Sequence, residues 1–213
     1  MQVVITGANR GIGAALAHAY KARGDFLLGT ARDASADICL DVAKPSDFGA
    51  LSDALGDAPL DLLICNAGVY LDKGQALETG YDADLWAQSF AVNVTGVFLT
   101  VQTVLANLRA AKGKVAIISS QMASHTHAPG GSYIYRASKA AVLSVGRNLA
   151  ADLKPDGIAV GIYHPGWVRT DMGGSTADIG VEEATAGLLA RFDALSLETT
   201  GCFETWDGRA HPY

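Results

Sequence analysis

The chain has 213 residues, of which 49% are hydrophobic, enough for one compact domain with a sizeable apolar core. Its formal net charge of −6 argues against a nucleic-acid-binding surface. No apolar stretch approaches the ~20 residues that a membrane-spanning helix needs, so we expect neither nucleic acid nor membrane as a partner. Because the N-terminus has the pattern of a strand, not of a signal peptide, and the three cysteines are widely spaced, we expect a cytoplasmic protein.

Apolar runs alternate with helical stretches along the whole chain, which is typical of a parallel sheet covered by helices. The expected strands are Val3–Thr6, Asp25–Gly29, Asp37–Leu40, Leu60–Asn66, Lys114–Ser119, Ile158–Tyr163 and Gly201–Glu204. The expected helices are Ile12–Arg23, Ser46–Leu55, Tyr81–Ala110, Tyr133–Lys154 and Val181–Phe192. The pattern therefore predicts an α/β fold, with one doubly wound parallel sheet of about seven strands and helices on both faces, in a single domain 1–213.

One connection in this pattern is unusually short. Only about seven residues, Thr30 to Ala36, separate the second and third strands, whereas a parallel crossover usually takes a dozen or more and contains a helix. We therefore predict that this helix is missing. Elsewhere, Ser46 is expected to cap the helix that follows Pro45, and Gly24 is expected just after the end of the first helix.

The first strand runs into a glycine-rich turn, Thr6-Gly7-Ala8-Asn9-Arg10-Gly11-Ile12-Gly13, which opens an alanine-rich helix. Glycines let backbone N–H groups approach a pyrophosphate, and the helix dipole favours its negative charge. The spacing is Gly-x-x-x-Gly-x-Gly, not the commoner Gly-x-Gly-x-x-Gly. A glycine cluster alone is often only a tight turn, but its place between a strand and a helix favours a dinucleotide phosphate site.

Tyr135 and Lys139 lie four residues apart at the start of another alanine-rich helix, which places a phenol and an ammonium on one helical face. An unperturbed tyrosine, with a pKa of about 10, is a poor acid–base group near neutrality. A lysine charge about 4 Å away can stabilise the phenolate by roughly 4 kcal/mol, so we expect Lys139 to lower the pKa of Tyr135. Such a pair is otherwise an ordinary helix surface. Tyr133 has Ala137 as its i+4 partner and is interpreted as a pocket wall.

The order of motifs along the chain resembles the short-chain dehydrogenase/reductase family, over nearly the whole chain. The matching motifs are the glycine turn, Asn66-Ala67-Gly68, Val92-Asn93-Val94-Thr95-Gly96, Ile118-Ser119-Ser120, the Tyr135–Lys139 pair, and His164-Pro165-Gly166-Trp167-Val168-Arg169-Thr170. The C-terminal residues Asp207–Tyr213 and the run from Gly166 to Gly174 further resemble the small C-factor and sniffer-like carbonyl reductases. The resemblance implies a Rossmann-type fold and an NADP(H)-dependent oxidoreductase that interconverts a small carbonyl compound and an alcohol.

The resemblance also implies a catalytic set of Asn93, Ser120, Tyr135 and Lys139. In carbonyl reduction Tyr135 would protonate the oxygen and Ser120 would steady it, while Lys139 and Asn93 would tune and reload Tyr135. From the residues alone, a satisfied core amide is the favoured interpretation of Asn93, and only the resemblance favours a part in a proton relay. Ser119 and Ser124 compete with Ser120, and Ser119 better fits a cap of the strand end because side chains alternate between faces.

The cofactor site that the resemblance implies is spread over the strand ends and one later loop. Its residues are Gly7, Asn9, Arg10, Gly11, Ile12, Gly13, Arg32, Asp41, Val42, Asn66, Ala67, Gly68, Tyr135, Lys139, Pro165, Gly166, Val168 and Thr170. Arg32 stands where NAD-preferring relatives place an acidic residue, and with Arg10 it is expected to hold a 2′-phosphate. We therefore expect NADP(H), with NAD(H) as the less favoured cofactor.

The remaining expectations concern ligands and partners. His125 and His127 have no nearby cysteine or acidic residue, so we expect no metal site and place them at the substrate mouth. Trp167 and Met172 are candidates for an apolar lid, although ordinary packing explains Trp167 equally well. The two longest helices are apolar on more than one face, which favours a homodimer or homotetramer. A cofactor-sensing or signalling protein without turnover is the alternative on the same fold.

Overall fold

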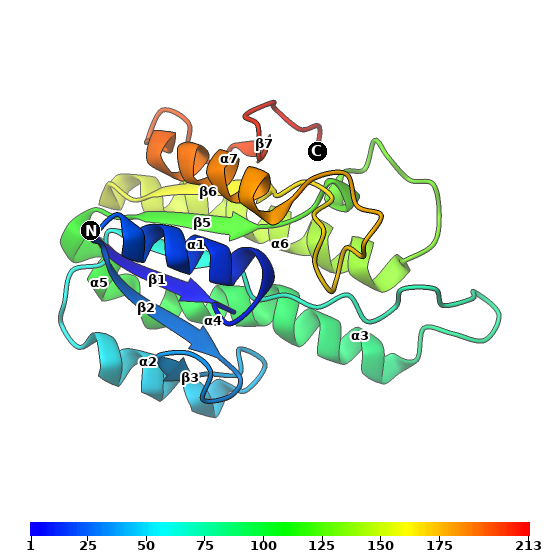
Figure 1. Ribbon diagram of the computed structural model, residues 1–213, viewed down its shortest axis with the longest axis horizontal. Helices are drawn as coiled ribbons and strands as arrows, with labels where there is room; N and C mark the ends of the chain where they lie inside the picture. Colours follow the sequence, from blue (N-terminus) through cyan, green and yellow to red (C-terminus); the bar gives the residue numbers. More distant parts are fainter.

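The computed structural model describes residues 1–213 and is built around one sheet of seven strands, all parallel, in the order β3-β2-β1-β4-β5-β6-β7 (Figure 1). The strands are β1 (Gln2–Thr6), β2 (Phe26–Ala31), β3 (Ile38–Cys39), β4 (Leu62–Cys65), β5 (Lys114–Ile118), β6 (Ala159–His164) and β7 (Phe203–Thr205). All seven expected strands form, with ends that differ from the prediction by at most two residues. The order is that of a doubly wound Rossmann-type sheet.

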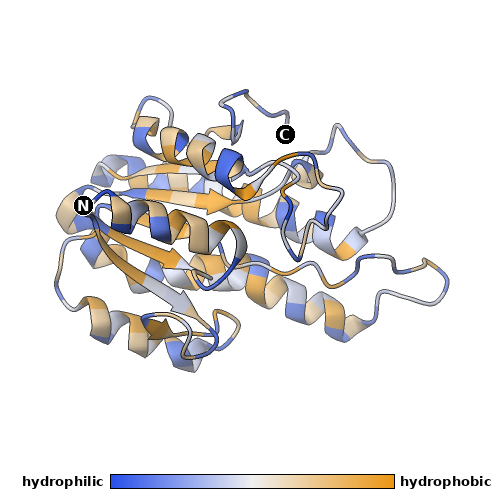
Figure 2. Cartoon of the chain, viewed as in Figure 1, coloured by the Kyte–Doolittle hydropathy of each residue, from blue (hydrophilic) through white to orange (hydrophobic).

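Helices cover both faces of this sheet, as predicted. They are α1 (Gly11–Ala22), α2 (Phe48–Leu55), α3 (Ala83–Phe90), α4 (Gly96–Thr103), α5 (Leu105–Ala111), α6 (Tyr133–Leu153) and α7 (Val181–Ala194). The larger apolar cluster lies between the sheet and α2, α4 and α6, and the smaller one between the sheet and α1 and α7. In Figure 2 the central strands are coloured mainly as hydrophobic residues, and helices lie on both sides of the sheet.

The helix expected over Tyr81–Ala110 is broken into three. α3 begins after Asp82, whose side chain accepts the Asp84 N–H, and continues through a π-helical stretch, Ala91–Thr95, into α4. The helical path breaks at Val104, where α3 and α4 together are bent by 57° from α5. Apolar periodicity runs through the π-helical stretch and through the break at Val104, so it could not reveal either of them. No single helix is long and apolar enough to cross a membrane, and only the bent combination passes by length and composition.

The two expected helix caps have different outcomes. Gly24 has a φ of +81°, and the N–H groups of Gly24 and Asp25 bond back to the carbonyls of Lys21 and Tyr20, which closes α1 as predicted. The Ser46 cap is wrong. Pro45 already occupies the first position of a 3₁₀ turn, so Ser46 lies inside that turn and α2 starts only at Phe48.

The helix between β2 and β3 is missing, as predicted. Residues 32–37 link the strands directly, and β3 pairs only through Ile38 and Cys39. The Asp37 carboxylate accepts the Gly29 N–H at 2.8 Å, and Asn9 Nδ2 donates to Ser35 Oγ at 3.1 Å. The short link is therefore tied both to β2 and to the glycine turn.

Candidate active site

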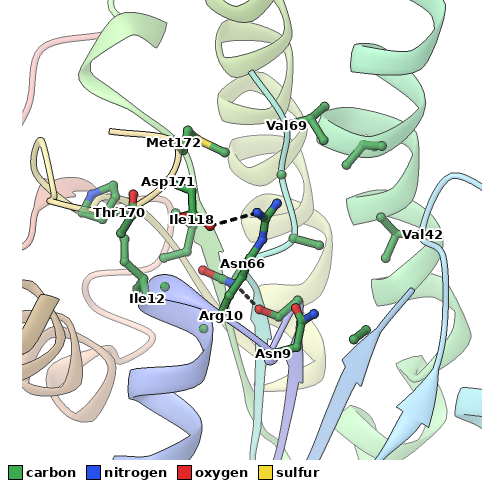
Figure 3. A pocket seen from close by; sticks show the side chains of 18 of the residues that line it. Asn9, Arg10, Ile12, Val42, Asn66, Val69, Ile118, Thr170, Asp171 and Met172 are labelled. Carbon is green, nitrogen blue, oxygen red and sulfur yellow. Dashed lines mark hydrogen bonds and ion pairs between the residues drawn. The ribbon is translucent and has the colours of Figure 1, made fainter. Parts of the chain in front are cut away.

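A cleft of about 650 Å³ lies where the C-terminal ends of the central strands meet the loops around them (Figure 3). In doubly wound sheets this is where ligands bind. All the residues expected to hold a cofactor line the cleft except Gly166 and Val168. Gly166, at a φ of +90°, lies against Ile179 and Trp206, and Val168 is buried. Both residues therefore support the loop after β6 and do not line the cleft.

The glycine turn forms a cradle that side chains would fill. Gly7 has a φ of +68°, and a Cβ there would lie 3.0 Å from the Cα of Ala67. A Cβ on Gly13 would lie only 2.1 Å from the Gly7 carbonyl oxygen. α1 begins at Gly11 with no acidic residue in its first turn and no side-chain cap. The backbone N–H groups of this turn therefore suit a pyrophosphate, and the residues present fit a dinucleotide.

Asn66 fixes the glycine turn from the neighbouring strand. Its Nδ2 donates to the carbonyls of Thr6 and Gly7, both at 3.0 Å. In return, the Thr6 hydroxyl oxygen accepts the N–H groups of Asn66 and Ala67 at 3.1 Å. These four bonds hold the ends of β1 and β4 together and so set the shape of the cradle.

Four buried side chains from α6, the π-helical stretch and the end of β5 lie at the far end of the cleft or behind its wall, and two of them, Tyr135 and Lys139, line it. Tyr135, Lys139, Ser120 and Asn93 are 7%, 5%, 7% and 1% exposed. Lys139 Nζ donates to the Ile118 carbonyl at 3.0 Å and lies 5.7 Å from the Tyr135 ring centroid. The structure therefore brings together all four residues of the expected catalytic set.

Burial, and not the lysine charge, dominates the proton affinity of Tyr135. Burial raises its pKa to about 12, and hydrogen bonding by Ser120 offsets part of that rise. Burial also lowers the pKa of Lys139 to about 8. The expectation that Lys139 lowers the pKa of Tyr135 is wrong for this arrangement, because burial is the largest cause acting on the phenol and the Lys139 ammonium is bonded to the Ile118 carbonyl. Tyr135 is thus protonated at neutral pH.

The three competing serines have different bonds. Ser120 Oγ accepts the Met122 N–H at 3.1 Å, which leaves its own proton to donate. Ser119 donates to the Lys139 carbonyl at 3.1 Å and so holds α6 against the end of β5. The Ser124 hydroxyl bonds to the carbonyl of the C-terminal Tyr213. Of the three, Ser120 is the one placed at the phenol, with a hydroxyl proton that is not given to a backbone carbonyl.

The side-chain amide of Asn93 is fully occupied. Its Oδ1 accepts the Val69 N–H, and its Nδ2 donates to the Val69 carbonyl, both at 2.9 Å. Nδ2 also donates to Ser138 Oγ at 3.0 Å. These bonds are those of a satisfied core amide, and they join the π-helical stretch to α6 and to the segment after Gly68.

Two residues that the sequence motifs did not indicate, Tyr70 and Asp72, contact the start of α6. The Asp72 carboxylate is completely buried and accepts the N–H groups of Ile134 and Tyr135. The ring of Tyr70 stacks on that of Tyr135, with centroids 4.2 Å apart. The only signal in the sequence was an acidic residue after an apolar stretch, and its partner lies about 60 residues later in the chain, where spacing rules do not reach.

The other end of the cleft is lined by exposed charged side chains. Arg10 and Arg32 both line it, but Arg10 Nη1 bonds to Asp171 Oδ2 at 3.2 Å, from the glycine turn across to the loop after β6 (Figure 3). Asp33 accepts hydrogen bonds from Ser35, which lower the pKa of its carboxyl group. Asp41 also lines this end, and its carboxylate accepts the Ala43 N–H at 3.0 Å.

The loops beside the cleft carry the other residues that were singled out. His125 and His127 are exposed, and no group of three potential metal ligands is found in the structure. Met172 lines the cleft, whereas the Trp167 indole donates to the Gly173 carbonyl at 2.9 Å and closes its own loop. Met172 therefore fits the expected lid better than Trp167 does.

Comparison with known proteins agrees with this geometry. A family model described as short chain dehydrogenase matches residues 1–178. The chain is 37% identical to the C-signal of Myxococcus xanthus, over 73% of this chain and 93% of that protein. It is 33% identical to the 1-hydroxy-2-glutathionyl-2-methyl-3-butene dehydrogenase of Rhodococcus sp. (strain AD45), over 97% and 96%. The NADPH-bound carbonyl reductase from chicken fatty liver superimposes with a TM-score of 0.90 at 26% identity, over 100% and 98% of the two chains.

Proposed function

Because the chain belongs to the short chain dehydrogenase family, a family of oxidoreductases, we propose that it is an NADP(H)-dependent carbonyl reductase or alcohol dehydrogenase. The observation that carries this proposal is the group of buried side chains Tyr135, Lys139 and Ser120 beside a cleft that is also lined by the glycine turn. The substrate is a small carbonyl compound or alcohol.

In the reduction direction, the carbonyl carbon would accept a hydride, which is the chemistry that a nicotinamide cofactor held in the cleft would supply. Ser120 donates its free O–H to the carbonyl oxygen, whose negative charge grows as the reaction proceeds. Tyr135, protonated at neutral pH because its pKa is about 12, then gives its phenolic proton to that oxygen. Lys139 holds the end of β5 through the Ile118 carbonyl, with its Nζ 5.7 Å from the Tyr135 ring centroid.

The preference for NADP(H) rests on Arg32 and Arg10. Both line the exposed end of the cleft, where the short link between β2 and β3 brings Arg32 next to the glycine turn. A guanidinium can pair with a 2′-phosphate, which NAD(H) lacks. Arg10 is already paired with Asp171 and would have to break or share that ion pair to bind the 2′-phosphate. Arg32 is therefore the principal phosphate contact in this proposal.

We also propose that the protein acts in the cytoplasm as a homodimer or homotetramer. Trp86 on α3 and Phe98 on α4 are 36% and 44% exposed, on the helices expected to pair. A two-fold contact between copies would cover them. Light scattering at micromolar concentration tests this: a species well above the chain mass of 22.1 kDa is expected, and a monomer would contradict it.

The competing function is a cofactor sensor or signalling protein, which the similarity to C-signal favours. The discriminating experiment is incubation with NADPH and a panel of aldehydes and ketones, followed by nicotinamide absorbance. Steady cofactor oxidation with at least one carbonyl compound is expected. Tight NADPH binding without turnover on a broad panel would favour the sensor instead.

A further inference from the structure

The four residues that follow Gly68 in the loop after β4, the 69–72 segment, include two that contact the start of α6, Tyr70 and Asp72. The first turn of α6 carries Tyr135. Val69 is held at both its N–H and its carbonyl by Asn93, so the segment starts from a fixed point in the core. Two of its next three side chains then reach Tyr135 or its immediate neighbours.

Asp72 caps α6 from outside the helix. Its carboxylate accepts the Ile134 N–H at 2.8 Å and the Tyr135 N–H at 3.2 Å, two of the donors that a helix start leaves unpaired. The residue in the N-cap position, Ser132, has a φ of +49° and makes no side-chain cap bond of its own. Asp72 is 0% exposed, and no ion pair is found for it. A buried carboxylate is costly unless it is bonded, so these N–H groups are what hold it there.

Tyr70 fixes the ring of Tyr135. The two rings stack at 4.2 Å between centroids with an angle of 20° between their planes. The Tyr70 hydroxyl is hydrogen bonded to Ser132 Oγ, next to the first residue of α6. The backbone of Tyr135 is therefore held by Asp72, and its ring by Tyr70.

We propose that Asp72 and Tyr70 are positioning residues that hold Tyr135 in its reactive orientation. The inference rests on the proposed role of Tyr135 as proton donor. Asp72 acts on the backbone of the turn and Tyr70 on the ring, so their effects on the reaction are transmitted through Tyr135.

The charge of Asp72 gives the inference a chemical signature. Four groups lie near Tyr135: Ser120, Lys139, Tyr70 and Asp72. The hydrogen bond of Ser120 lowers the pKa of Tyr135, whereas Tyr70 and Asp72 add to the rise that burial causes. Removing the negative charge of Asp72 makes the phenolate less unfavourable, so the pKa of Tyr135 falls. The loss of reductase activity at high pH should then begin at a lower pH.

The first test is Asp72→Asn, measured for kcat, KM for NADPH and the pH profile of reduction. We expect kcat to fall roughly 10- to 100-fold, as for a small displacement of a reacting group, with little change in NADPH binding. The basic limb of the profile should move to lower pH. The matched control is Asp82→Asn, which removes a carboxylate cap from α3 but should leave kcat and the pH profile unchanged.

Tyr70→Leu and Tyr70→Phe test the ring contact, and they decide the matter if Asp72→Asn does not fold. Leucine should lower kcat about tenfold with NADPH affinity retained, and phenylalanine, which keeps the stack, should restore most of that rate. Wild-type kcat and pH profile in the folded Asp72→Asn and Tyr70→Leu proteins would overturn the inference. Tyr135→Phe, assayed beside them, distinguishes failure of the proposed function from failure of this inference. An active Tyr135→Phe would contradict the role of Tyr135 as proton donor. If Tyr135→Phe alone is inactive, only the positioning roles of Asp72 and Tyr70 are contradicted.

Discussion

At one end of the cleft, Tyr135, Lys139 and Ser120 are each no more than 7% exposed, whereas at the other end the side chains of Arg10 and Asp171 are 63% and 81% exposed. The buried end is held by hydrogen bonds between elements far apart in the chain, such as the bond from Ser119 to the Lys139 carbonyl. The exposed end depends on one glycine turn and one short link. Substitutions at the buried end should therefore have large effects on rate, and those at the exposed end small effects on cofactor choice.

Tyr135→Phe should produce the largest effect. It removes the transferable proton and keeps the ring that stacks on Tyr70, so kcat should fall by about 10²–10⁴ while NADPH affinity stays close to wild type. Steady-state kinetics and cofactor titration check this. Tyr133→Phe is the matched control, because Tyr133 is 41% exposed and has no lysine one turn later. If Tyr135→Phe kept more than about a tenth of wild-type kcat, Tyr135 would not be the proton donor.

His164, at the end of β6, should make stability depend on pH. Burial is the main cause that lowers its pKa from 6.5 to about 4; His211 and Arg209 add to this, and Asp207 opposes it. The unfolded chain therefore takes up a proton as pH falls through 6.5, while the folded protein does not until about 4. Relative to pH 7, the free energy of unfolding at pH 5 should fall by about 2 kcal/mol from this group.

Urea unfolding of wild type and His164→Asn at both pH values isolates this contribution. The variant should lose about that much of the pH dependence, whereas His18→Asn, which changes an exposed histidine of α1, should not. Equal pH dependence in wild type and His164→Asn would show that the histidine is not desolvated in the folded protein.

Arg32→Ala should have a smaller effect, confined to the phosphate of the cofactor. A charge-assisted contact is worth about 1.5–3 kcal/mol, so NADPH affinity should fall at least about tenfold while NADH affinity is nearly unchanged. Titration of both cofactors measures this. Arg109→Ala is the control, because Arg109 is also exposed but pairs with Asp156 away from the cleft. Equal affinity of the wild type for NADH and NADPH would contradict the assignment of Arg32.

Asp171→Asn should have the smallest effect and the opposite sign. It frees Arg10 from an exposed ion pair, which is worth at most about 1 kcal/mol, so NADPH affinity should rise by up to about fivefold. The gain should vanish in the double variant Arg10→Ala with Asp171→Asn. A loss of NADPH affinity in the single variant would show that Asp171 itself helps to bind the cofactor.

Local pattern was sufficient for much of the fold. Most strands contain a short apolar run next to polar or glycine residues, and the short link from Thr30 to Ala36 has too few residues for a helix, so both could be predicted. The family resemblance, carried by the same motifs, is confirmed by the match to residues 1–178. The break at Val104 and the π-helical stretch were missed because hydrophobic periodicity continues across them.

The site could be predicted where two interacting residues belong to one motif, and it could not be predicted where a property depends on how deeply a group is buried. The Tyr135–Lys139 spacing placed both side chains correctly on one face of α6. The direction of the pKa change at Tyr135 was wrong, because desolvation depends on what packs around the phenol. Asp72 was missed for a similar reason: its function as a cap exists only once the 69–72 segment lies against α6.

Transfer of deuterium from NADPH labelled at the reactive nicotinamide carbon tests the central claim most directly. The protein is incubated with the labelled cofactor and a carbonyl compound that it turns over, and the alcohol is analysed by mass spectrometry. The account predicts one deuterium on the former carbonyl carbon for each cofactor oxidised by wild type and Tyr133→Phe, and labelled alcohol formed about 10²–10⁴ times more slowly by Tyr135→Phe. Cofactor binding without any labelled alcohol, across a broad panel of carbonyl compounds, would contradict it.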